Sequence, residues 1–278
     1  LWRAVTSADP WLLMLGTGLL VVGHVGAVLR FRGCLDPLRA KAPVNQVVTT
    51  TFLAILFNQL LPTGVGGDVA RLFAIGPKAN FARVLYASLA DRAIGFVMII
   101  VSAAMLAPLY DGYVEPQIIW MIFLFGVAVV AAVAFLAIVR RTWFEIARQR
   151  RFLMPEALWN ILRAIRIILR PQRLGFIFFA MLLAYTPYIL GFYVIGTAIG
   201  SMPIASLACI PLILLTTLIP LSVGGWGVRE GAALVIFGRI GVSPEIAIGA
   251  SMMFGILMTF SSLSLFLCGQ VRGYKKCD

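Results

Sequence analysis

The sequence predicts an all-α membrane protein, a polytopic helical bundle with two inverted repeats, each containing a re-entrant broken-helix hairpin. Three observations support this fold class. Of the 278 residues, 61% are hydrophobic and only 12% are charged, whereas soluble domains are about 25% charged. Five apolar stretches are long enough to cross a hydrocarbon core of about 30 Å. Two further apolar stretches are interrupted by the same short motif.

The whole chain, residues 1–278, is predicted to be one integral membrane domain. The first repeat covers about residues 11–109 and the second about residues 174–268. An extra span lies between them and inverts the second repeat against the first. The five predicted spans are Trp11–Leu29, Phe81–Leu109, Ile118–Val139, Leu174–Ile199 and Pro244–Cys268. A basic amphipathic stretch, residues 143–170, is predicted to lie as a helix in the cytoplasmic interface.

Each repeat also contains an interrupted apolar stretch. Val44–Leu61 is followed by Pro62 and a glycine-rich segment, and Pro203–Ile219 is followed by Pro220 and two glycines. Proline and paired glycines end helices. The apolar pieces that follow are too short to cross a membrane at about 1.5 Å per residue. We therefore predict two hairpins, each returning to the side from which it entered.

The two breaks share a sequence motif. Residues 60–71 align without gaps on residues 218–229, at a constant offset of 158 residues. Leucine, proline, valine, two glycines and arginine coincide in this alignment. Inverted repeats with discontinuous helices are typical of secondary transporters that hold their substrate near the membrane midplane.

The basic residues predict the orientation, because cytoplasmic loops are enriched in Lys and Arg. Eighteen of the 23 Lys and Arg residues fall in four segments that one topology places on the same side. These segments are residues 30–41, residues 78–83, Arg140–Arg173 and residues 272–276. We expect the C-terminus to be cytoplasmic and the location to be a bacterial cytoplasmic (inner) membrane. The net charge of +12 is assigned to membrane surfaces and not to nucleic acid.

The broken helices predict an anion site. A helix that begins inside the membrane presents unpaired N–H groups and the positive end of its dipole, which bind phosphate or carboxylate. Arginines follow both breaks by about one turn, and their planar guanidinium matches phosphate oxygens. The candidate lipid headgroup-binding residues are Gly66, Gly67, Asp68, Arg71, Gly224, Gly225, Arg229 and Glu230. The supporting residues are Asn58, Asp91, Arg92 and Trp226. Asp68 is also predicted to be the N-cap of the first short helix.

Other interpretations of these residues stay open. Charges at membrane depth are costly, so the acids and bases could simply neutralise one another and hold the bundle together. An intermediate case has Asp91 and Glu230 orienting arginines whose other donors face the substrate. Asn58 and Gln59 could satisfy carbonyls freed at the break instead of contacting a ligand. The only histidine, His24, is predicted to be a packing or hydrogen-bonding residue.

The sequence contains no signature of catalysis. It has no GxxxxGK[ST] loop, no cluster of His and Cys with metal-ligand spacing, and no nucleophile–base pair near the interface. We therefore expect a non-enzyme without cofactor or metal.

Three motifs resemble the transmembrane region of lysylphosphatidylglycerol synthases, a flippase-like family of integral membrane proteins. Leu61 to Arg71 matches the family stretch Leu-Pro-x-x-x-Gly-Gly-Asp-x-x-Arg, and Asp91 to Gly95 matches acidic-Arg-x-x-Gly. Pro220, Gly225, Gly227, Arg229, Glu230 and Gly231 match a third stretch near the C-terminus. The resemblance covers nearly the whole chain and implies transbilayer movement of a phospholipid or related lipid. In bifunctional members a soluble aminoacyl-transferase domain follows the membrane part, and that activity is not expected here. A first span usual in the family is expected to be missing before Leu1.

The sequence thus predicts a flippase or scramblase-like transporter that moves an anionic phospholipid or related lipid through a midplane headgroup site. One alternative is a membrane-embedded or lipid-presenting subunit of a lipid-modifying transferase. A further alternative is a structural subunit of a membrane complex. The expected partner is membrane phospholipid, with a homo-oligomer or a separate soluble transferase as further partners.

Overall fold

The computed structural model describes residues 8–61, 66–111, 113, 115–138, 156–217 and 224–274, and every regular element in these ranges is helical. The long helices are α2 (Pro10–Leu35), α5 (Phe81–Leu106), α6 (Pro116–Ile138), α9 (Pro171–Ile199) and α12 (Pro244–Tyr274). The shorter helices are α3 (Val44–Leu60), α4 (Gly66–Ala79), α8 (Glu156–Ile168), α10 (Ser206–Thr216) and α11 (Val228–Gly238). Two 3₁₀ turns, η1 (Asp36–Leu38) and η2 (Ala107–Tyr110), follow α2 and α5.

Within the described ranges, five helical segments are long and apolar enough to cross a membrane, which confirms the predicted spans. They are Pro10–Leu38, Phe81–Tyr110, Pro116–Phe135, Pro171–Ile199 and Pro244–Gln270. The first of them continues well beyond the predicted end at Leu29, and this extension carries Arg30 into the bundle, whereas Arg32 is exposed.

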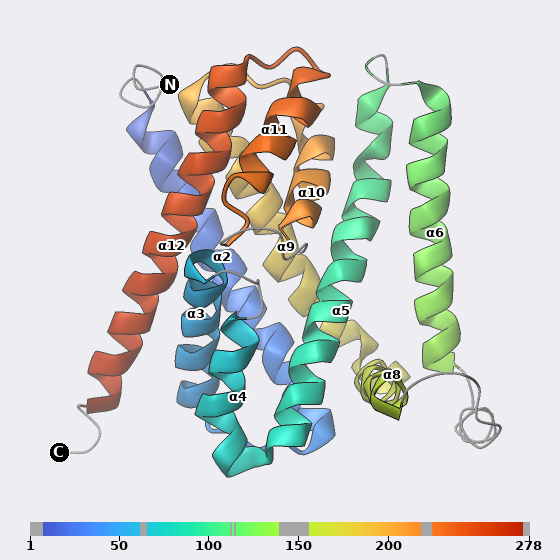
Figure 1. The fold of residues 1–278 in the computed structure, drawn as a ribbon, viewed down its shortest axis with the longest axis vertical. Helices are drawn as coiled ribbons and strands as arrows, with labels where there is room; N and C mark the ends of the chain where they lie inside the picture. Colours follow the sequence, from blue (N-terminus) through green and yellow to red (C-terminus); the bar gives the residue numbers. More distant parts are fainter. Residues whose placement is uncertain are drawn as a thin grey trace.

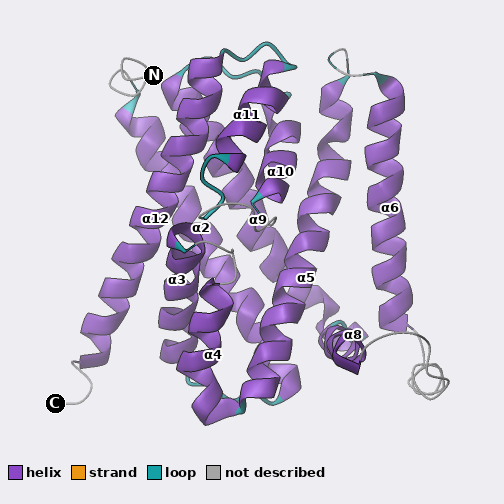
Figure 2. Ribbon diagram, viewed as in Figure 1, coloured by secondary structure: helices purple, strands orange, loops and turns teal. Residues whose placement is uncertain are grey.

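The four short helices next to the breaks form two helical hairpins (Figure 1). Helices α3 and α4 lie towards the end of the bundle where α12 finishes, and the C-terminal end of α3 and the N-terminal end of α4 are near mid-height. Helices α10 and α11 lie towards the opposite end, and the C-terminal end of α10 and the N-terminal end of α11 are also near mid-height (Figure 2). The turns themselves, residues 62–65 and 218–223, lie outside the described residues.

The tips of the two hairpins contact each other. The Gly224 N–H donates to the Leu61 carbonyl oxygen at 3.2 Å, and the Trp226 indole N–H donates to the Gln59 carbonyl oxygen at 3.1 Å. Gly224 has a φ of +58°, and a Cβ atom there would collide with the backbone of Gln59. Only glycine combines this left-handed conformation with such a close approach, so the tip contact depends on Gly224.

Helices α2 and α9 run side by side through the bundle and connect its two halves. At their crossing a Cβ on Gly26 would collide with the backbone of Leu183 and Ala184. Small residues at such crossings let membrane helices pack closely. His24 lies two residues before Gly26, is fully buried, and contacts Tyr188 and Ser261 through its two ring nitrogens at 2.8 and 3.1 Å. The predicted hydrogen-bonding role of His24 is therefore confirmed.

Helix α8 lies across the long axis of the bundle, seen end-on in Figure 1. Its apolar residues Ala164 and Ile168 are buried, and Ile168 belongs to the core cluster that also contains Val84 and Ala87 of α5. The exposed Arg163 lies on another side of the helix. Much of the apolar surface that the sequence assigned to the lipid interface is therefore covered by protein. Residues 143–155 of the predicted interfacial stretch lie outside the described residues.

Candidate functional site

A cavity of about 210 Å³ lies where the two hairpin tips approach α2, α5, α9 and α12. Its charged lining residues are Arg30, Arg71, Arg92, Arg229, Asp68 and Asp91. Four arginines against two aspartates give this lining a formal net charge of +2. The volume is far above the roughly 15 Å³ that one water molecule requires, so the cavity has room for a polar group larger than water.

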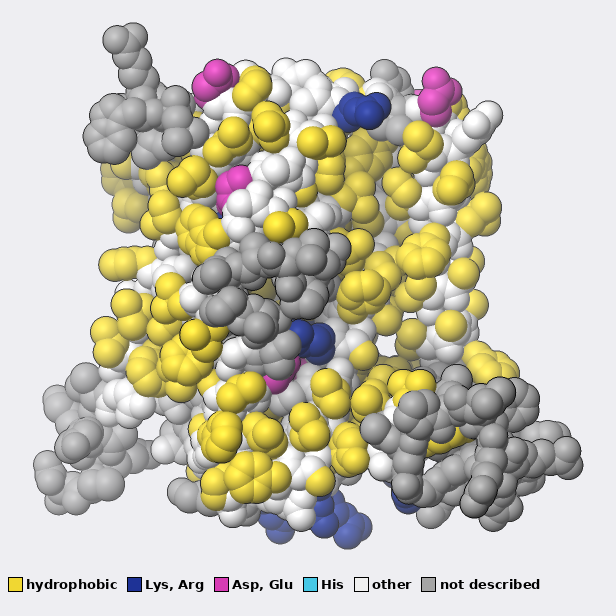
Figure 3. Space-filling view, viewed as in Figure 1, with side chains coloured by type: hydrophobic (Ala, Val, Ile, Leu, Met, Phe, Trp, Pro, Cys, Tyr) yellow, Lys and Arg dark blue, Asp and Glu magenta, His cyan; other side chains and the backbone are white. Residues whose placement is uncertain are grey.

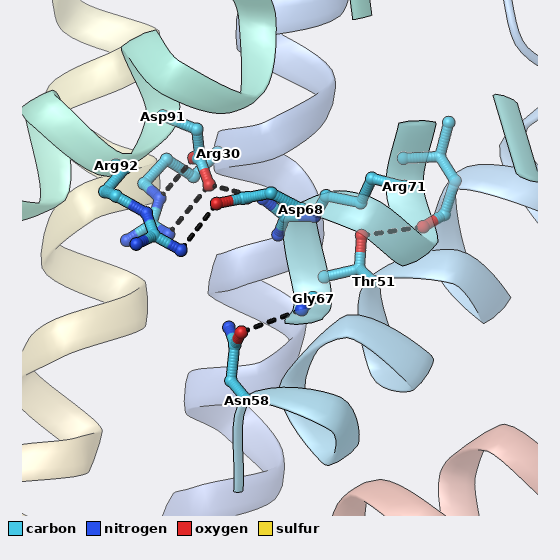
Figure 4. A network of polar contacts seen from close by, with 9 residues as sticks. Arg30, Thr51, Asn58, Gly67, Asp68, Arg71, Asp91 and Arg92 are labelled. Atoms are coloured by element: carbon cyan, nitrogen blue, oxygen red, sulfur yellow. Dashed lines mark hydrogen bonds and ion pairs between the residues drawn. The ribbon is translucent and has the colours of Figure 1, made fainter. Parts of the chain in front are cut away.

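Asp91 is the centre of the charged network (Figure 4). Arg30 binds it bidentately, with Nε donating to Oδ1 at 2.6 Å and Nη2 donating to Oδ2 at 3.1 Å. Arg71 donates from Nη1 to the same Oδ2 at 2.9 Å. Because Asp91 is 2% exposed, one buried carboxylate fixes two guanidinium groups from two other helices.

Asp68 provides the second carboxylate of the network. Its Oδ2 accepts from Arg92 Nη2 at 2.5 Å, and its Oδ1 lies 3.7 Å from Arg71 Nη1. The prediction that Asp68 is an N-cap is wrong, since α4 begins at Gly66 and Asp68 lies inside its first turn. The carboxylate turns towards arginines of α4 and α5 because these side chains supply full charges in a buried place.

The start of α4 is capped by a side chain from α3. The Gly67 N–H donates to Asn58 Oδ1 at 2.9 Å. This N–H therefore already has a partner and is not available to bind an anion. A Cβ on Gly67 would meet Ala54 and Asn58, which explains glycine there. The sequence left open whether Asn58 satisfies freed carbonyls or contacts a ligand. In the structure its Oδ1 accepts from a backbone N–H, and the residue also lines the cavity.

Arg71 is buried but incompletely paired. The residue is 7% exposed, and its guanidinium carbon lies 4.0 Å from the centre of the Phe31 ring. Among the described residues, no group accepts a hydrogen bond from its buried Nε. A buried donor without a partner costs about 1–3 kcal/mol, so this atom favours a ligand with a free acceptor.

Arg229, the counterpart of Arg71 in the repeated motif, has different surroundings. Its Nη2 donates to Glu230 Oε1 at 3.0 Å, and its Nε donates to Ser251 Oγ, also at 3.0 Å. The guanidinium lies 5.1 Å from the Trp226 ring. Glu230 also accepts from the Gly227 N–H at 2.6 Å and so caps α11. Arg229 is thus neutralised within its own half of the molecule.

The sequence analysis missed Arg30 as a site residue. It was counted among the cytoplasmic positive charges after Leu29, whereas α2 continues to Leu35 and keeps Arg30 inside the bundle. Its guanidinium lies 5.1 Å from the Tyr185 ring centre. The available signal was Asp91, a buried acid that needs a nearby cation.

Most of the predicted residues come together, with a few exceptions. Those that line the cavity are Asn58, Asp68, Arg71, Asp91, Arg92, Gly224 and Arg229. Gly66 instead lines an apolar groove between α3 and α4. Gly67 and Glu230 act through hydrogen bonds to neighbours, and Trp226 joins the two tips. Gly225 accepts the Arg229 N–H through its carbonyl oxygen at 2.9 Å.

The charged network reaches the surface of the bundle at mid-height. Figure 3 shows side chains of both signs there, surrounded by hydrophobic side chains and directly below residues drawn in grey. The side chain of Arg92 is 32% exposed. A polar group could therefore reach the network from the side of the bundle.

The model of the protein family described as lysylphosphatidylglycerol synthase TM region matches residues 1–264 of the chain. The matched range includes both hairpins and every charged residue that lines the cavity. No curated protein matches the chain. The five candidate spans and the family match together indicate an integral membrane protein.

Proposed function

Because the chain belongs to the lysylphosphatidylglycerol synthase TM region family, which indicates a membrane lipid-related role, we propose that it moves an anionic phospholipid or related lipid across the bilayer. In this proposal it is a flippase or scramblase-like transporter and carries out no chemistry on the lipid. The lipid headgroup binds in the cavity between the hairpin tips while the acyl chains stay in the bilayer.

The buried Nε of Arg71 is the observation on which the proposal depends. This donor has no partner among the described residues, and it lines a cavity whose charges leave an excess of one positive charge once Arg229 is paired with Glu230. A phosphodiester supplies one negative charge and several acceptor oxygens, so it satisfies both features. Arginine and phosphate form short, charge-assisted hydrogen bonds that are about twice as strong as neutral ones.

The proposed membrane arrangement follows from the directions of the hairpins. With the long axis of the bundle along the membrane normal, α3–α4 and α10–α11 are re-entrant hairpins that enter from opposite faces (Figure 1). The repeated motif at an offset of 158 residues supports a relation between the two halves by inverted repetition. The end that carries α8 is the cytoplasmic end, and the membrane is the bacterial cytoplasmic membrane.

Asp68 is the residue that a phosphate displaces most readily in this proposal. Its partner Arg92 is partly exposed, whereas Arg30 and Asp91 are held together by two hydrogen bonds in the interior. A headgroup that arrives from the side would exchange with Asp68 at Arg92 and then reach Arg71. Passage to the other leaflet requires the hydrogen bonds between the hairpin tips to open.

Transport in reconstituted vesicles tests the proposal. Arg71→Gln removes the unpaired donor while Asp91 keeps Arg30, so the protein should fold and lose at least about tenfold in the rate of labelled-phospholipid movement. Arg163→Gln removes an exposed arginine of α8 and should leave the rate unchanged. A folded Arg71→Gln protein that moves lipid at the original rate would contradict the proposal.

A second candidate is a lipid-presenting subunit of a lipid-modifying transferase. One finding favours it, namely that the description of the matched family names a synthase. Vesicles that contain only this chain separate the two candidates. Lipid movement without any added protein supports transport, whereas movement that needs a soluble transferase supports the second candidate.

A further inference from the structure

A second buried atom in the cavity is unpaired, and it is an acceptor. Gln59 lies at the end of α3 and is 9% exposed. Its backbone carbonyl already accepts the Trp226 indole N–H, while its side chain lines the cavity. Among the described residues, no group donates to the buried Oε1 of Gln59.

The repeated motif supplies an internal comparison for this residue. At the offset of 158 residues, Gln59 corresponds to Thr217, which also lines the cavity. The Thr217 hydroxyl donates to the Leu214 carbonyl oxygen at 2.7 Å. The equivalent side chain of the second hairpin therefore has a partner near the end of its own helix, whereas Gln59 Oε1 has none among the described residues.

The two unpaired atoms differ in hydrogen-bonding sense. Arg71 Nε is a donor, which an ionised phosphodiester satisfies. The same phosphodiester carries no proton and cannot donate to Gln59 Oε1. An unsatisfied buried acceptor destabilises the bound state as an unsatisfied donor does, so a ligand that serves both atoms must combine a phosphate with a hydrogen-bond donor.

We propose that Gln59 is a specificity-determining residue that accepts a hydrogen bond from a hydroxyl or ammonium group carried by the lipid headgroup next to its phosphate. This inference rests on the proposed function and names the chemical class of its substrate. With Arg229 neutralised by Glu230, the remaining three arginines and two aspartates of the lining leave one positive charge. This excess favours a headgroup that is anionic overall, and hence a hydroxyl as the donor.

The test compares labelled lipids in two pairs matched in charge. Phosphatidylglycerol and phosphatidylmethanol both carry one negative charge, but only the first has headgroup hydroxyls. Phosphatidylethanolamine and phosphatidylcholine are both zwitterionic, but only the first has ammonium N–H groups. In vesicles with the unmodified protein, the donor-bearing member of the hydroxyl pair should move about tenfold faster than its partner. A similar preference within the ammonium pair would identify ammonium as an accepted donor as well.

The variant Gln59→Met keeps the length of the side chain and the backbone contact with Trp226, but removes the acceptor. It should lose the preference for phosphatidylglycerol over phosphatidylmethanol. Gln46→Met is the matched control, because Gln46 lies on the same helix and also has an unpaired buried Oε1 among the described residues, but does not line the cavity. It should keep the original preference.

Two results would overturn the assignment. Equal rates within both pairs for the unmodified protein would show that the headgroup brings no donor to the cavity, and this result does not depend on the folding of any variant. An unchanged preference in folded Gln59→Met would show that another group recognises the donor. In either case the transport of phospholipid stands, whereas the absence of movement of all four lipids by the unmodified protein would contradict the proposed function itself.

Discussion

The two hairpins carry the same motif but hold their arginines in different ways. In the α3–α4 hairpin, Arg71 shares the distant Asp91 with Arg30 and keeps one buried donor without a described partner. In the α10–α11 hairpin, Arg229 pairs with the adjacent Glu230 and with Ser251. The paired glycines also differ in conformation, because Gly66 and Gly67 begin α4 whereas Gly224 and Gly225 precede α11 with positive φ. The residues around each arginine therefore decide which hairpin is prepared for a ligand.

The residue after the paired glycines shows the origin of this difference. It is Asp68 in the first hairpin and Trp226 in the second. Asp68 adds a charge that binds Arg92, whereas Trp226 donates to a carbonyl of the other tip and lies beside Arg229. We infer that the first hairpin binds the headgroup and that the second closes the cavity.

The largest expected effect comes from the shared carboxylate. Asp91→Asn leaves the buried Arg30 without its negative partner and leaves Arg71 with only Asp68, at 3.7 Å. The free energy of unfolding should therefore fall by about 3–5 kcal/mol. Glu230→Gln affects one arginine and a partly exposed carboxyl group, and should cost less. Unfolding of the purified proteins in detergent would compare the two variants. Equal losses of unfolding free energy would contradict the proposed difference between the two hairpins.

The contact between the tips gives the next effect. Gly224→Ala places a Cβ against the Gln59 backbone at a φ of +58°, whereas Gly227→Ala has a φ of +82° and open space around the added atom. Both variants have the cost of a left-handed residue, about 1–2 kcal/mol, but only the first forces the tips apart. Thermal unfolding should therefore show a larger loss for Gly224→Ala, and the reverse order would contradict the proposed contact.

The smallest effect is expected at the paired counterpart of Gln59. Thr217→Val removes a hydroxyl that already donates within α10, so the relative transport rates of phosphatidylglycerol and phosphatidylmethanol should change less than about twofold. A loss of preference as large as that in Gln59→Met would show that the second hairpin also recognises the headgroup.

The sequence was sufficient to predict the parts of the fold that depend on local composition. The five spans follow from hydropathy, and the breaks follow from proline and paired glycine. The pairing of charges depends on which helices pack together, and local sequence patterns do not predict the packing of helices. Arg30 illustrates the point, because its position after an apolar run is typical of a loop, and only the packing of α2 beside α5 shows that it binds Asp91.

Two other differences between the sequence predictions and the structure also arise from tertiary packing. The spacing of arginines and apolar residues predicts that α8 is amphipathic, but not whether lipid or protein covers its apolar residues. The place of Asp68 after two glycines is typical of an N-cap, but arginines of α4 and α5 bind its carboxylate more strongly than backbone N–H groups do. The sequence thus predicted which types of residue form the candidate site. Their contacts and geometry could be known only from the tertiary structure.

The topology provides an independent check on the arrangement of the hairpins. If they enter from opposite faces, Asp111→Cys should react with a membrane-impermeant thiol reagent applied to intact cells, and Arg163→Cys should react only after the cells are opened. Both variants belong in a background without Cys34, Cys209, Cys268 and Cys277. Labelling of Arg163→Cys from outside would contradict the proposed orientation.

A structure of the protein in a bilayer containing phosphatidylglycerol would test the central claim most directly. We predict a lipid phosphate in the cavity, with an oxygen about 2.7–2.9 Å from Arg71 Nε and a headgroup hydroxyl beside Gln59 Oε1. A well-ordered cavity that holds only water, with lipid confined to the outer surface of the helices, would contradict the account and leave the arginines as part of the packing of the bundle.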